Sequence, residues 1–111
     1  MSVNLNRKMV LERAERVADG AGGFTQAWVP VGTLWAALKP GSGRERLGAG
    51  VTVSSVPWRI TVRAAPMDSS ARVLPDQRLR EGARVFRVTA VAEADADARY
   101  LTCFAIEEAA G

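Results

Sequence analysis

The residues of this sequence that could do chemistry are few, and their types favour binding over catalysis. The 111-residue chain has no histidine, so an imidazole base or metal ligand is not available. Cys103 is the only cysteine, and its place in the apolar run 101–106 predicts a small buried residue rather than a reactive thiol. Glu107 and Glu108 form the only adjacent carboxylate pair, and neighbours in a strand point to opposite faces, which favours a solvated strand end. We therefore predict no enzyme activity, no metal site and no cofactor.

The charged residues are mostly arginines and are unevenly distributed along the chain. The formal charge is +3, and only Lys8 and Lys39 among the 15 basic residues are lysines. Residues 39–63 carry five basic residues and one acidic residue, whereas residues 93–108 carry five acidic residues and one basic residue. Opposite patches on one domain favour head-to-tail contacts between identical copies, which close into rings or extend into filaments. Ordinary solvated surface charge is the simpler explanation of this feature taken alone.

Length and composition indicate a single soluble domain with one modest core. No run of about 18 apolar residues is present to span a membrane. Residues 1–7 lack the apolar region of a signal peptide. We expect a protein of the reducing cytosol, or of a particle assembled there.

Alternating apolar and polar residues predict several short β-strands. In residues 56–63 the apolar side chains of Trp58, Ile60 and Val62 alternate with polar ones, which places Trp58 in the core rather than on a base-stacking surface. Turn signals such as Asp19-Gly20 separate the strands. The pattern predicts a small antiparallel β-barrel or sandwich. The other expected strands are residues 33–38, 83–91 and 100–106.

Two segments do not fit this strand pattern. Residues 9–18 have apolar residues and a Glu12–Arg16 pair at helical spacing, and on pattern alone a helix is favoured over a strand that leads into the glycine-rich turn. Residues 41–55 form a long connection in which Arg44, Glu45 and Arg46 are bracketed by glycines, with room for one helical turn. Such a connection is typical of a functional loop or of a disordered one. The glycines are Gly41, Gly43, Gly48 and Gly50.

Four short motifs follow one another in an order that spans residues 7–108. They are DGAGGF at 19–24 before Trp28, WA at 35–36 followed by Pro40 and by GRE at 43–45, WRITVR at 58–63, and a hairpin pattern of Arg78, Gly82 and Phe86. In this order they resemble the phage head–tail joining family, the small head-closure or stopper proteins between portal assembly and tail. A stopper of a prophage-derived gene transfer agent is a similar but narrower match. Trp58 replaces the usual His of the family, and residues 66–74 form a longer connection than usual.

The resemblance implies a small β-barrel or sandwich subunit, repeated in a homo-oligomeric ring that continues the portal channel of a virion or phage-like particle assembled in the bacterial cytoplasm. It implies that residues 9–13 form the first strand. It also implies that the loop 41–55 points toward the channel and helps to retain packaged DNA until the tail attaches. Arg44, Glu45 and Arg46 are then the predicted channel or gating residues, with sequence-blind phosphate contacts and glycine hinges.

The partners implied by the resemblance are proteins of the head and tail, and DNA. We expect portal or adaptor proteins on the head side, the tail terminator or tail tube on the tail side, and double-stranded DNA in the channel, without a membrane. The ends at 1–8 and 107–111 are expected to be flexible in a monomeric or weakly associated free protein. The alternatives are a β-barrel nucleic-acid-binding module and the adjacent tail-terminator subunit. The predicted ring or partner contacts are Arg7, Lys8, Arg59, Arg63, Glu107 and Glu108.

Overall fold

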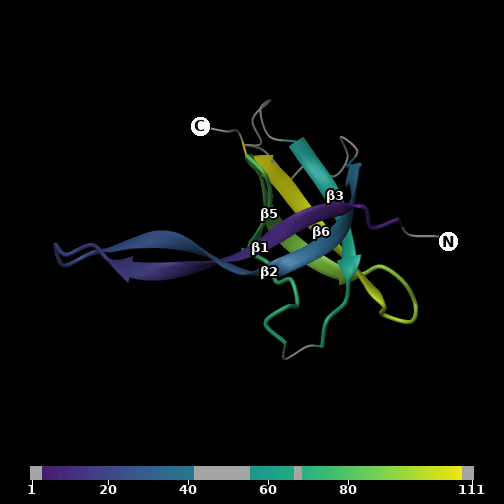
Figure 1. Cartoon of the computed structure of the whole chain (residues 1–111), viewed down its shortest axis with the longest axis horizontal. Coiled ribbons are helices and arrows are strands. Elements are labelled where there is room, and N and C mark those ends of the chain that lie inside the picture. Colours follow the sequence, from purple (N-terminus) through teal and green to yellow (C-terminus); the bar gives the residue numbers. More distant parts are fainter. Residues whose placement is uncertain (1–3, 42–55, 67–68, 109–111) are drawn as a thin grey trace.

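Six strands form one antiparallel sheet that closes into a barrel in the order β1-β2-β3-β6-β5-β4 (Figure 1). The computed structural model describes residues 4–41, 56–66 and 69–108, and the described part contains no helix. The strands are β1 (Arg7–Ala18), β2 (Phe24–Pro40), β3 (Val56–Arg63), β4 (Arg78–Glu81), β5 (Arg84–Glu93) and β6 (Tyr100–Glu108). The predicted small antiparallel β-barrel or sandwich is therefore confirmed, in the form of a closed barrel.

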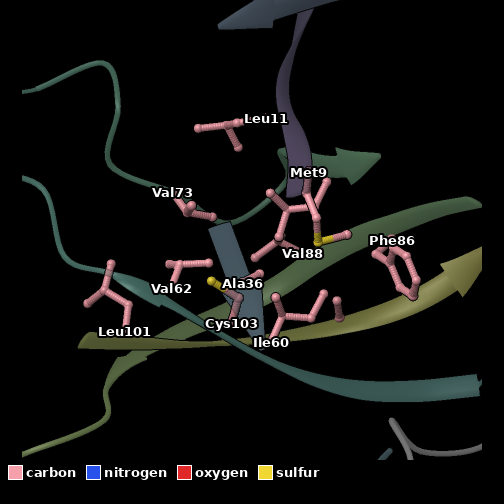
Figure 2. Close-up of a cluster of buried hydrophobic side chains, with 12 residues drawn as sticks. Met9, Leu11, Ala36, Ile60, Val62, Val73, Phe86, Val88, Leu101 and Cys103 are labelled. Carbon is pink, nitrogen blue, oxygen red and sulfur yellow. The ribbon is translucent and has the colours of Figure 1, made fainter. Parts of the chain in front are cut away.

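The core lies inside the barrel and is built from alternate residues of every strand (Figure 2). Trp58 packs against this core, and its ring meets that of Phe86 edge-on, with centroids 5.9 Å apart. Cys103 is fully buried, as predicted, and burial raises the pKa of its thiol to about 12. The buried residues are Met9, Leu11, Ala36, Ile60, Val62, Val73, Leu79, Phe86, Val88, Leu101, Cys103 and Ala105.

The helix that the pattern alone favoured for residues 9–18 is wrong, because this segment belongs entirely to strand β1, Arg7–Ala18. Met9 and Leu11 are buried two residues apart, and β1 pairs with β2 on one side and with β4 on the other. Strand pairing on both sides outweighs the local helical spacing. Glu12 does not pair with Arg16 but binds arginines of β4.

β1 and β2 continue beyond the barrel as a two-stranded hairpin, here called the arm, which comprises residues 13–30 (Figure 1). Within the described chain, β4 pairs with β1 only at Val10–Glu12, and β3 pairs with β2 only from Ala36 onward, so the arm's strands pair only with each other. A bulge between Leu11 and Glu12 marks the point where the arm leaves the barrel. The molecule consequently measures 53 × 34 × 24 Å.

The turn at the tip of the arm explains the DGAGG motif. Asp19 Oδ1 accepts hydrogen bonds from the backbone N–H groups of Ala21 (2.8 Å) and Gly23 (3.1 Å). Gly20 and Gly22 have φ angles of 80° and 85°, which residues with a Cβ adopt reluctantly. The motif therefore specifies a tight hairpin tip.

Four residues of the segments that we predicted to be flexible lie in strands. Arg7 and Lys8 belong to β1, and Glu107 and Glu108 belong to β6. Pairing with neighbouring strands holds them, since Arg7 lies opposite Ala36 and both glutamates have partners on β5. Val73, in the connection between β3 and β4, is buried in the core of the barrel.

Candidate functional site

The predicted channel loop leaves the barrel from the paired ends of β2 and β3, here called the loop root. Pro40 pairs with Trp58 at the last position of this ladder, and the Gly41 N–H donates a hydrogen bond to the Pro57 carbonyl at 2.9 Å. Gly41 is thus hydrogen-bonded to β3, and its predicted part in the movement of the loop stays a prediction. Arg44, Glu45, Arg46, Gly43, Gly48 and Gly50 lie outside the described residues, so their role in the channel stays a prediction.

A chain of ion pairs, here called the mouth network, closes the barrel end from which the loop leaves. The Trp58 indole N–H donates to Glu107 at 3.0 Å, and Arg84 donates to both oxygens of Glu107 at 2.8 and 3.1 Å. Arg84 also lies 3.8 Å from Glu81, which binds Arg7 through its other contacts. Five of the six strands therefore contribute to the network. Trp58 joins the network to the loop root, because it pairs with Pro40 and binds Glu107.

The mouth network follows from the same alternation that builds the core. Each member is two residues from a buried residue of its own strand, so its side chain points inward at the level where the apolar core ends. The pairs are Arg7 with Met9, Trp58 with Ile60, Glu81 with Leu79, Arg84 with Phe86, and Glu107 with Ala105.

The mouth network keeps its carboxylates ionised. The hydrogen bond from Arg7 lowers the pKa of Glu81, and the hydrogen bond from Arg84 lowers the pKa of Glu107, in each case against the opposing effect of burial. The guanidinium of Arg84 also lies over the rings of Trp58 and Phe86, at 5.4 and 5.0 Å from their centroids. These contacts hold the side chains that close the barrel in one arrangement.

The six predicted contact residues divide between this network and the outer surface. Arg7 and Glu107 are brought together at the mouth, where each has an ion-pair partner within the chain. Lys8, Arg59, Arg63 and Glu108 are exposed on the outside of the barrel. The structure describes one chain, so contact with a neighbouring subunit stays a prediction for all six.

A second charged cluster, here called the arm base, lies on the outer face where the arm leaves the barrel. Glu12 is buried, and its carboxylate accepts hydrogen bonds from Arg78 (2.5 Å) and Arg80 (3.1 Å). Burial acts to raise the pKa of Glu12, but these hydrogen bonds outweigh it and hold the pKa below its ordinary value. Arg78 also stacks on Trp28 of the arm, with 4.4 Å between its Cζ and the ring centroid.

Sequence reasoning missed Glu12, Arg78 and Glu81 as structural charges, because their partners are remote in the chain. Arg7 and Glu81 are 74 residues apart, and Glu12 and Arg78 are 66 residues apart. Within the described ranges, no group of three or more acidic or cysteine residues could hold a metal ion, and no helix is long and apolar enough to cross a membrane.

The fold and sequence were compared with known proteins. A family model described as phage head completion protein matches residues 1–108. A chain of a solved structure titled "Virion of native gene transfer agent (GTA) particle" is 54% identical, with a TM-score of 0.80 over 99% of this chain and 100% of its own. The solution structure of protein SF1141 from Shigella flexneri 2a shares the fold, with a TM-score of 0.67, 22% identity and 96% of each chain covered.

A comparison with characterised proteins gave no match. The family match and the virion structure confirm the resemblance to head-closure proteins that the motifs indicated. A head completion protein is a structural component of the virion. The chain belongs to the family of phage head completion proteins.

Proposed function

We propose that this protein closes the head of a phage-like particle as one subunit of a ring that continues the portal channel. The particle is of the gene transfer agent type, as is the virion that contains the 54% identical chain. The ring holds packaged DNA, receives the portal or adaptor proteins on the head side and provides the docking surface for the tail terminator or tail tube. Family membership supports the head-closure role, and the construction of the loop root supports a loop that retains DNA.

The observation that carries the proposal is the anchoring of the loop root. The long connection between Gly41 and Val56 starts and ends on a β2–β3 ladder whose outermost aromatic, Trp58, is held by the mouth network. Glycine accepts a wide range of backbone dihedral angles, so a glycine-rich sequence between two anchored ends suits a change of conformation. The base therefore suits a loop that holds DNA and then yields to its passage.

The charges of the loop fit this task. Arg44 and Arg46 flank a single acid, Glu45, and a ring multiplies their positive charge by the number of subunits. Arginine contacts with DNA phosphates are salt-dependent and independent of sequence. A collar of such contacts retains DNA of any sequence without fixing its register.

A double substitution, R44A/R46A, tests the proposal in particles that lack tails. We expect these heads to release DNA, measured as nuclease-sensitive DNA after head purification. The matched control, R87A/R99A, removes the same charge from two exposed arginines of the barrel and is expected to leave DNA retained. Full retention by the loop variant in heads that contain the protein contradicts the DNA-retention role.

The alternative of a nucleic-acid-binding module that acts alone has less support. Trp58, the aromatic residue of the arginine-containing strand β3, is not available for base stacking, because its ring packs against Phe86 and its N–H binds Glu107. This alternative predicts that the free protein binds duplex DNA in a salt-sensitive way, whereas head closure requires binding only in the assembled channel. The description of the matching family as head completion also favours closure over the tail-terminator position.

A further inference from the structure

The arm carries apolar side chains that are largely exposed in the described chain. Phe24 is 60% exposed and Val17 is 44% exposed, and they lie on opposite faces of the hairpin next to its tip. A two-stranded hairpin without other packing is marginally stable in water. The arm therefore presents an exposed apolar surface that another molecule can cover.

The arm base gives this surface a defined direction. The ring of Trp28 lies under the Arg78 guanidinium, and Arg78 is in turn bound to the buried carboxylate of Glu12. Further out, the Arg16 guanidinium lies 4.2 Å from the centroid of Phe24. The contacts of Trp28 hold the root of the arm against β4, and the Arg16 guanidinium covers one face of the Phe24 ring at the tip. The arm therefore projects from the barrel as a preformed element.

The same chain has an uncovered hollow of about 510 Å³ on the barrel, a size typical of a binding pocket. Trp35, which is 53% exposed, forms one wall, and the Arg63 guanidinium lies 6.0 Å from the ring centroid of Tyr100 on another. Trp, Tyr and Arg are the residue types that contribute most to binding at protein interfaces. The full lining is Leu5, Leu34, Trp35, Arg63, Ala64, Ala65, Ala71 and Tyr100.

The arm and the hollow belong to different sides of the molecule. Figure 1 shows the arm extending from one side of the barrel, whereas the segment before β1 approaches the barrel on the other side. Leu5 of that segment lines the hollow. A protrusion on one side and a hollow on the other produce head-to-tail contacts, and such contacts close into a ring when the rotation between copies permits.

We propose that the tip of the arm of one copy occupies this hollow on the next copy in the ring, with Phe24 against Trp35 and Tyr100. The exposed carboxylate of Asp19 at the tip then meets the cationic rim formed by Arg63 and by Lys8, which lies opposite Trp35 on β1. The contact buries apolar groups that are exposed on both sides and pairs opposite charges. This inference rests on the proposed ring, and it names the surfaces that would build it.

Cysteine cross-linking in assembled particles tests the contact. The double variant F24C/A71C places one thiol at the arm tip and one at the exposed edge of the hollow, and the native Cys103 does not interfere because it is buried. We expect mild oxidation to give disulfide-linked multimers of this chain on denaturing gels, whereas F24C and A71C alone give monomers. The matched control F24C/A92C, with its second thiol exposed on β5, is expected to give monomers as well.

A second measurement is photo-cross-linking, with a side chain that keeps an aromatic ring at the tip of the arm. A benzophenone side chain at position 24 is expected to cross-link to peptides of another copy that contain Trp35, Ala65 or Ala71. Either of two results overturns the arm-in-hollow contact while head closure stands. The first is a cross-link from position 24 to a different virion protein, and the second is that F24C/A71C gives only monomers in DNA-filled particles. Particles that lack the protein yet remain intact, tailed and filled overturn the proposed function itself.

Discussion

The buried carboxylate of Glu12 can be probed with the single substitution Glu12→Gln. The side chain of Glu12 is 6% exposed and accepts hydrogen bonds from both Arg78 and Arg80. Glutamine keeps the shape of the side chain but removes its charge, and it turns an amide N–H₂ toward one of the guanidinium groups. The variant therefore weakens the arm base without leaving a cavity.

The size of the effect follows from the exposure of the partners. A hydrogen bond to a charged group contributes about 1.5–3 kcal/mol. The side chains of Arg78 and Arg80 are 21% and 37% exposed, so water recovers part of the interaction when the carboxylate is lost. We expect a loss of about 2 kcal/mol in the free energy of unfolding at neutral pH, which lowers the Tm of a domain of this size by about 10 °C.

The same substitution predicts a pH dependence with a definite sign. The pKa of Glu12 is lower in the folded protein than its ordinary value of 4.5, so ionised Glu12 stabilises the fold above that pH. This contribution is lost as the pH falls from about 4.5 through the folded pKa. The gap in unfolding free energy between wild type and E12Q is therefore full at pH 7 and shrinks in acid. Glu81 and Glu107 titrate in both proteins and cancel in the difference.

Urea unfolding of both proteins between pH 7 and pH 3 measures this gap. The matched control is Glu15→Gln, which removes the same charge from an exposed position of the arm and should change stability by no more than about 0.5 kcal/mol. The interpretation of the arm base is refuted if E12Q costs no more than E15Q, or if the gap is as large in acid as at neutral pH.

Two further predictions concern the barrel. Trp58→Phe keeps an aromatic ring against Phe86 but removes the N–H that binds Glu107. We expect the free energy of unfolding, measured by thermal unfolding, to fall by about 1 kcal/mol. An unchanged Tm would contradict a role for this bond in closing the mouth. The Cys103 thiol, with a pKa raised to about 12 and no exposed surface, should resist alkylation at pH 8 until the protein is unfolded. Mass spectrometry of the native protein checks this, and rapid labelling would show that the barrel opens easily.

The strands with alternating apolar residues could be predicted from the sequence, and the reason is local. Residues 56–63 form β3 with the expected bounds, since Ile60 and Val62 face the core and Arg59 and Arg63 face outward. Residues 9–18 misled the pattern analysis because apolar residues happened to recur at helical spacing. The pairing of β1 with β4, which decides its conformation, joins segments more than 60 residues apart.

The charged side chains were harder to predict than the strands. No local spacing indicates that Arg7 binds Glu81, because the closed barrel brings the two strands together only after folding. One signal was present in the sequence. A charged residue two positions before the first core residue of a strand, or two after the last, points inward at the barrel end and requires a partner there. Arg84, two positions before Phe86, is such a residue.

The two charged clusters support the two projecting parts of the molecule independently. The mouth network uses inward-facing side chains at one end of the barrel and holds the loop root through Trp58. The arm base uses outward-facing side chains of β1 and β4 and holds the arm through Trp28. The described contacts give the clusters no residue in common, so their substitutions should have separable effects. Glu12→Gln should weaken the arm contact between copies while the loop root stays fixed, and Trp58→Phe should do the reverse.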